Sequence, residues 1–110
     1  MSLRSWKIRL EDIRDSLDLI AVYVQGLDYE AWKKDQKTID AVIRNMEIIG
    51  EAASHVPENI QERYSDVPWH QMKGMRNILA HEYFGVDLDV LWRTVQEDLP
   101  SLKIKIQKVL

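Results

Sequence analysis

Residues 69–87, with the sequence WHQMKGMRNILAHEYFGVD, gather the side chains best suited to chemistry in this 110-residue chain. They include two of the three histidines of the chain. The positive charges of Lys73 and Arg76 balance the negative charges of Glu82 and Asp87, so the segment has a net charge of zero, whereas the whole chain has a net charge of −3. Without Asp87 the segment carries +1, and with both histidines charged it reaches +3. A neutral-to-basic segment within an acidic protein is the arrangement that a phosphate-handling site needs. The alternative interpretation is an ordinary solvated helix face.

Helical geometry sorts this segment into faces. At about 100° per residue, its polar residues fall on one narrow stripe made of His70, Lys73, Asn77 and His81. The opposite side is apolar and is predicted to enter the core: Met72, Met75, Ile78 and Leu79. Arg76 and Tyr83, seven residues apart, share a position at the edge of that core.

Arg76 and His81 are five residues apart, and this spacing creates a geometric problem for a shared site. Five residues correspond to about 140° around a regular helix, so one copy of the chain cannot easily aim both side chains at one phosphate. Either the helix unwinds near His81, or the working site combines residues from two copies. The second possibility also suits the short chain, which has room for only a shallow or shared site.

The elements that must position this segment are predicted to be helices. The first carries a stripe that ends near Gly26: Trp6, Leu10, Ile13, Leu17, Ile20 and Val24. A second long helix lies between Asp35 and His55, with the stripe Ile39, Val42, Ile43, Met46, Ile49 and Ala53. His55 is expected to interact with the last carbonyls of that helix. A short helical turn follows over residues 57–64, and residues 66–68 offer a cap and a first-turn proline for the third long helix.

The third long helix is expected to end at Gly85, and Asp87 can cap the last one. That last helix continues the three-four apolar spacing to the C-terminus, with Pro100 predicted to kink or split it. Alternation by two, the pattern of strands, is nowhere sustained. The sequence therefore predicts one all-α domain over residues 1–110, an antiparallel (up-and-down) bundle of four main helices plus a short extra helix.

Composition excludes several classes of site. The chain has no cysteine, which excludes disulfides, thiol nucleophiles and thiolate metal sites. Its three histidines form no His-x3-His pair, so no metal and no cofactor is expected. The longest apolar run, Leu19–Val24, is far shorter than the roughly 20 residues of a membrane span. Arg4, Lys7 and Arg9 interrupt the apolar residues near the N-terminus, unlike a signal peptide, so a cytoplasmic protein without membrane contact is expected.

The string RNILAHEY, from Arg76 to Tyr83, fits the Arg-x4-His-x-Tyr signature of HepT-like toxins. These are small members of the HEPN (higher eukaryotes and prokaryotes nucleotide-binding) superfamily of metal-independent ribonucleases. The flanks resemble the same family: Pro68-Trp69 and Gly74-Met75 before the signature, Tyr83-Phe84-Gly85-Val86-Asp87 at its exit, Asp98-Leu99-Pro100 later, and Ile49-Gly50-Glu51-Ala52 in the second helix. The resemblance therefore touches most of the chain from residue 40 onward and implies a HEPN-like helical fold.

The resemblance implies a metal-independent endoribonuclease. Such an enzyme uses the neighbouring 2′-hydroxyl as nucleophile, so the protein supplies a base, an acid and cations for the phosphate. We assign His81 to proton transfer and Arg76 to the charge that develops on the phosphate. Asn77 is expected to orient or hydrogen-bond the RNA substrate, and Lys73 to steer phosphate. Glu51 is expected to pair with Arg76 across the bundle. Family members are described as dimers with a composite site, so a homodimer is expected.

Tyr83 has a separate implied role. In this family the tyrosine of His-x-Tyr is described as the acceptor of AMP groups from a partner antitoxin, a minimal nucleotidyltransferase that is usually encoded next door. An AMP group there adds charge and bulk beside Arg76 and so neutralises the toxin of a type VII-like toxin–antitoxin pair. The plain alternative for Tyr83 is a ring packed against the core edge with its hydroxyl in water.

Two other functions remain open from the sequence. One is a non-catalytic HEPN module that binds a nucleotidyltransferase or its nucleotide substrate and cleaves nothing. The other is a plain helical dimerisation protein in which the motif is a coincidence. Toxicity on expression separates the ribonuclease from both alternatives, and the identity of the adjacent gene separates the last alternative from the other two.

Overall fold

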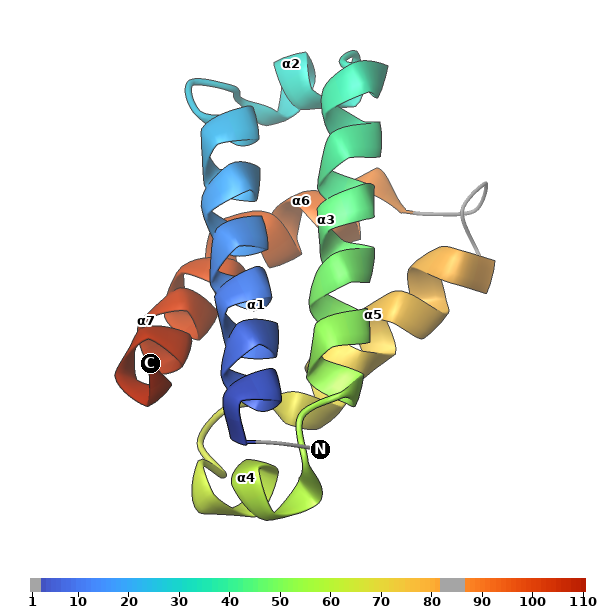
Figure 1. Cartoon of the computed structure of the whole chain (residues 1–110). Helices are drawn as coiled ribbons and strands as arrows, with labels where there is room; N and C mark the ends of the chain where they lie inside the picture. Colours follow the sequence, from blue (N-terminus) through green and yellow to red (C-terminus); the bar gives the residue numbers. More distant parts are fainter. Residues whose placement is uncertain (1–2, 82–86) are drawn as a thin grey trace.

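The computed structural model describes residues 3–81 and 87–110 of the chain, and the side chains of residues 6–76 and 87–110. Helices and their connecting turns account for these residues, and no strand occurs among them. Two long helices, α1 (Leu3–Val24) and α3 (Gln36–Ser54), run antiparallel beside each other (Figure 1). The all-α class predicted from the sequence is confirmed.

The remaining helices pack on this central pair. The helix with the signature motif, α5 (Trp69–His81), crosses α3 obliquely, while α7 (Leu99–Val109) packs against α1 (Figure 1). Short helices connect them: α2 (Tyr29–Lys33), α4 (Glu58–Arg63) and α6 (Leu88–Arg93). The bundle is therefore built from α1, α3, α5 and the C-terminal helical run. Helix α4 is the predicted extra helix.

Helix boundaries follow local chemistry. The carboxylate of Asp35 accepts a hydrogen bond from the backbone N–H of Thr38 (3.1 Å) and caps α3, which ends at Ser54 with His55 as its C-cap. The carboxylate of Asp87 accepts from the backbone N–H of Asp89 (2.9 Å) and caps α6. After α1, Gly26 takes φ +80°, a left-handed conformation that favours glycine and turns the chain toward α2. These three boundaries agree with the sequence-based predictions.

Helix α2 was not predicted, and its role is to bury one aromatic ring. Asp28 caps it by accepting from the backbone N–H of Ala31 (2.8 Å). Trp32 is fully buried, and the centroid of its ring lies 5.4 Å from the centroid of the Trp92 ring. Its Nε1 donates to the carbonyl of Leu88. This helix therefore closes the end of the α1–α3 pair against the start of the C-terminal run.

The C-terminal run is not a regular helix throughout. Between α6 and α7 the chain forms a π-helical turn, η2 (Thr94–Asp98), in which the N–H of Leu99 donates to the carbonyl of Thr94. Pro100 follows directly in the first turn of α7. A proline ring clashes with the carbonyl four residues before it and offers no N–H, and a wider turn relieves both problems. The break predicted at Pro100 is present as this π turn just before it.

Gly50 sets the closest approach of α3 to α5. A Cβ atom built on Gly50 would lie 2.6 Å from Arg76 Cβ, 2.8 Å from Arg76 N and 3.0 Å from the carbonyl oxygen of Met72. Only a residue without a side chain fits this crossing. Because the contact falls on Arg76 itself, the crossing fixes the backbone of that arginine against α3.

No helix in the described part of the chain combines the length and the apolar character needed to cross a membrane.

Candidate functional site

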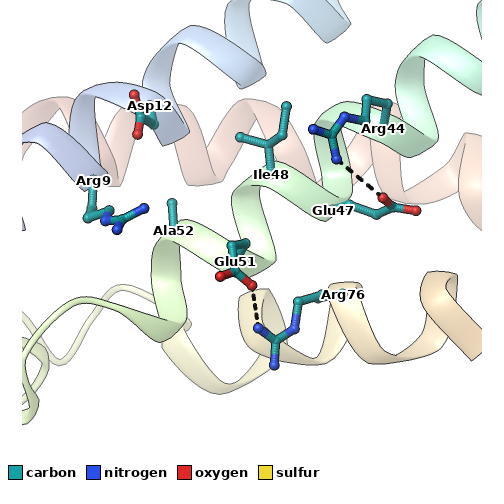
Figure 2. Close-up of a pocket in the computed structure, with 8 residues that line it drawn as sticks. All are labelled: Arg9, Asp12, Arg44, Glu47, Ile48, Glu51, Ala52 and Arg76. Carbon is teal, nitrogen blue, oxygen red and sulfur yellow. Dashed lines mark hydrogen bonds and ion pairs between the residues drawn. The ribbon is translucent and has the colours of Figure 1, made fainter.

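The α3–α5 crossing brings together two of the residues selected from the sequence. Arg76, on α5, donates from Nη1 to Oε2 of Glu51, on α3 (Figure 2). Both side chains are about half exposed, 42% for Arg76 and 49% for Glu51, so the pair faces solvent at the edge of the bundle. The expected pairing of these residues across the bundle is confirmed.

Glu51 has a second partner that the sequence did not indicate. Its Oε1 lies 2.9 Å from Nε2 of His55, one helical turn further along α3. Hydrogen bonds from His55 and Arg76 hold the pKa of the Glu51 carboxyl below its ordinary value. His55 does interact with the last carbonyls of α3, as predicted, through its backbone N–H, which donates to the carbonyl of Ala52 (3.1 Å), while its ring turns back to the Glu51 carboxylate. A histidine four residues after a glutamate could have signalled the contact.

The other residues selected from the sequence lie along α5. Lys73 donates from Nζ to Oε1 of Gln61 on α4 (2.9 Å). Asn77 and His81 belong to the helical backbone of α5, but their side chains lie outside the described residues. Tyr83 lies outside the described residues altogether. Because α5 is α-helical through His81, the helix does not unwind before this residue.

An open pocket of about 310 Å³ adjoins Arg76. Helices α1, α3 and α5 contribute its lining residues: Arg9, Asp12, Arg44, Glu47, Ile48, Glu51, Ala52 and Arg76 (Figure 2). Three arginines and three carboxylates face this pocket, so its lining carries no net charge. Sequence reasoning missed the pocket because its charges come from three separate helices and share no local spacing.

A second pocket, of about 620 Å³, lies where α4 meets the start of α5. Its ionisable lining residues are mostly acidic: Glu58, Glu62 and Asp66 against Lys73, with His70 beside them. The pocket next to Arg76 is therefore better suited to an anionic ligand, because it holds three guanidinium groups. Among the residues that the structure describes, no cluster of three or more His, Asp or Glu side chains is arranged to hold a metal ion.

Residues 13–109 match the model of a family described as "HepT-like: Ribonuclease HepT-like". A protein of Thermococcus cleftensis named "Probable ribonuclease HepT" is 46% identical over 106 residues, which cover 96% of each chain. A protein of Methanocaldococcus jannaschii named "Putative RNase MJ1380" is 39% identical over 109 residues, 99% of this chain and 100% of the relative. Another, from Caldanaerobacter subterraneus subsp. tengcongensis and named "Putative RNase TTE0752", is 37% identical over 92% of this chain and 90% of its own. No solved structure matches the chain significantly.

Proposed function

Because the chain belongs to the HepT-like ribonuclease family, we propose that it is a metal-independent endoribonuclease that acts in the cytoplasm through Arg76 and His81. The observation that carries the proposal is the setting of Arg76. Its backbone is fixed by the close crossing at Gly50, its guanidinium is held by Glu51, and it borders an open pocket. A guanidinium that is already oriented loses little entropy when it binds a phosphate.

In the proposed reaction the 2′-oxygen of the RNA attacks the adjacent phosphorus, and the bond from phosphorus to the 5′-oxygen breaks. The products are a 2′,3′-cyclic phosphate and a 5′-hydroxyl. His81 of one copy accepts the proton of the 2′-hydroxyl, and His81 of the second copy donates a proton to the leaving 5′-oxygen. Arg76 donates to the non-bridging oxygens as their charge grows. Asn77 orients the substrate, and Lys73 contributes to phosphate steering.

The proposed enzyme is a homodimer. One support is the regular helix from Arg76 to His81, since residues five apart lie about 140° apart around its axis and a single copy does not bring them together. Another is a set of exposed apolar side chains on α1: Ile8, Leu19, Val22 and Tyr23. Leu19 and Tyr23 lie about 20° to either side of Asp12 around the helix axis. Because Asp12 lines the pocket, a dimer formed through this face has its two pockets beside the interface.

We further propose that Tyr83 accepts AMP from a minimal nucleotidyltransferase antitoxin. The tyrosine oxygen attacks the α-phosphorus of ATP, and pyrophosphate leaves. The new phosphodiester carries a negative charge seven residues from Arg76 and competes with RNA for the guanidinium. The toxin is thereby neutralised without being unfolded.

Cleavage of a defined RNA by the purified chain tests the catalytic proposal. In the presence of EDTA we expect fragments that end in a 2′,3′-cyclic phosphate. His81→Ala should lower kcat by roughly 10²–10⁴-fold, the usual worth of a general acid or base. Arg76→Ala should lower it by about 10²–10³-fold. Arg93→Gln is the control, because this exposed residue of α6 lies outside the pocket. Full activity of folded His81→Ala would refute the assignment.

Co-expression with the nucleotidyltransferase encoded beside the chain tests the regulation. We expect the wild-type chain to gain mass in AMP units and to lose ribonuclease activity. The Tyr83→Phe variant should keep its unmodified mass and its ribonuclease activity. Unmodified wild type in the presence of the active partner and ATP would contradict the acceptor role. Tight binding of the partner by a chain that cleaves no RNA would instead support the non-catalytic module.

A further inference from the structure

The pocket beside Arg76 has the size and lining of a binding site for one small ligand. Its volume of about 310 Å³ is at the lower end of the roughly 300–1,000 Å³ of small-molecule sites. Ile48 and Ala52 of α3 supply apolar surface, while charged side chains of α1, α3 and α5 surround it (Figure 2). Six of the eight lining residues are charged, so the pocket suits a small ligand with charged and hydrogen-bonding groups and a lesser apolar part.

The arginines of this pocket retain hydrogen-bond donors. Arg9 has no ion pair or hydrogen bond with any other described side chain. Arg44 is 72% exposed, and its contact with Glu47 is long, at 3.6 Å. Arg76 uses Nη1 for Glu51, and within the described residues it makes no other such bond. Since a guanidinium has five N–H donors, all three arginines can bind phosphate oxygens without giving up their present partners.

We propose that this pocket is a subsite for one nucleotide of single-stranded RNA, next to the phosphodiester that is cleaved. The inference rests on the proposed ribonuclease function and extends it to the class of substrate. Arg9 and Arg44, which lie at opposite ends of the pocket, bind separate backbone phosphates of the strand, while Ile48 and Ala52 between them contact the apolar face of the base or ribose (Figure 2). Arg76 connects this subsite to the reacting phosphate.

The shape of the pocket favours an unpaired strand. A hollow lined by three helices can receive a nucleotide that is turned out of its stack, whereas the bases of a duplex are stacked and paired. The carboxylates of Asp12 and Glu47 are acceptors for amino groups on a base edge. Because the lining has no net charge, binding depends on directed hydrogen bonds more than on a general basic field.

Substitution of the two new arginines tests the subsite. Arg9→Gln and Arg44→Gln should each raise KM for a short single-stranded RNA by roughly three- to tenfold, the loss of one solvent-exposed charged hydrogen bond. Their kcat should stay close to that of the wild type. The slope of log Kd against log salt, measured with a 2′-deoxy analogue that cannot be cleaved, should fall by about 0.7 for each phosphate that the variant no longer neutralises. Arg93→Gln removes one positive charge from α6, outside the pocket, and should change neither KM nor the salt slope. The subsite is refuted if the two pocket variants behave as Arg93→Gln does.

A second measurement separates this inference from the ribonuclease proposal. Titration with uridine or guanosine 5′-monophosphate should shift the methyl resonances of Ile48 and Ala52, and Arg9→Gln should weaken the effect. If these shifts occur in a chain without ribonuclease activity, the subsite stands and the catalytic proposal fails. If the chain cleaves RNA but the shifts are absent and KM is unchanged in the variants, the subsite fails and the catalytic proposal stands.

Discussion

The substitution Gly50→Ala tests whether the close crossing of α3 and α5 fixes the position of Arg76. The new methyl carbon would lie 2.6 Å from Arg76 Cβ, whereas non-bonded carbon atoms rest about 3.5–4.0 Å apart. Relief therefore requires α5 to move by about 1 Å at this residue. Rotation of a side chain cannot supply the movement, because the contacting atoms are the Cβ and backbone atoms of α5.

Two opposing effects set the size of the stability change. Overpacking of a close contact costs about 1–3 kcal/mol, while alanine is favoured over glycine inside a helix by about 0.8–1.0 kcal/mol. The net loss in the free energy of unfolding is therefore at most about 2 kcal/mol, and the fold should survive. Activity should suffer more, because a displacement of about 1 Å at a catalytic group can cost 10²-fold in rate.

Gly74→Ala is the matched control, since Gly74 also lies inside a helix, α5, but a Cβ there meets no described heavy atom within 4 Å. It should raise the free energy of unfolding by up to about 1 kcal/mol and leave RNA cleavage unchanged. Urea unfolding and kcat/KM are measured for both variants. If Gly50→Ala gains stability as Gly74→Ala does and cleaves RNA at the wild-type rate, the crossing does not position Arg76.

Three further substitutions test the Glu51 carboxylate, the N-cap of α3 and the guanidinium of Arg76. Glu51→Gln should make the free energy of unfolding less sensitive to acid. His55 and Arg76 hold the pKa of the Glu51 carboxyl below its ordinary value of 4.5 in the folded chain. The carboxylate therefore stabilises the fold fully above that ordinary pKa, and this stabilisation is lost as the pH falls through the lower folded pKa. Urea unfolding from neutral to acidic pH measures this, and parallel curves for both proteins would contradict it. Asp35→Ala removes acceptors from the Thr38 N–H and hydroxyl and should lower Tm by roughly 4–8 °C, followed by circular dichroism. Asp35→Asn keeps an acceptor, and an equal fall would argue against the cap. Arg76→Lys keeps the charge but loses the planar fork, so kcat should drop while the fold is intact; wild-type kcat would show that charge alone suffices.

The sequence predicted most of the helix boundaries because their signals are local. Asp35 and Asp87 each accept a hydrogen bond from a backbone N–H that lies within the next three residues. Gly26 adopts the left-handed conformation of the turn that follows α1. Helix α2 escaped prediction because its five residues are too few to show a period, although Asp28 before them is an N-cap residue. The π turn escaped for a different reason. Pro100 predicts a break in the C-terminal helix, but the sequence does not specify which backbone conformation before the proline accommodates it.

The candidate site was predictable only in part, since its contacts depend on how helices pack. Arg76 and Glu51 could be matched because both belong to stretches that resemble one family. Arg9 and Arg44 could not, because their relation to Arg76 depends on the registers of α1 and α3, which the sequence pattern does not specify. His81 and Tyr83 remain predictions, since their side chains lie outside the described residues.

The charge of the chain and its proposed substrate can be reconciled through the pocket beside Arg76. A protein that carries −3 does not attract RNA by a general field. Here the carboxylate of Glu51 both cancels the charge of Arg76 and orients its guanidinium, which still has donors for a phosphate. We therefore expect the chain to bind RNA through short-range hydrogen bonds from oriented guanidinium groups, and not through long-range electrostatic attraction. The expected consequence is an enzyme with modest affinity for RNA, whose preference for a single strand arises from the pocket and whose rate depends on a correctly positioned guanidinium.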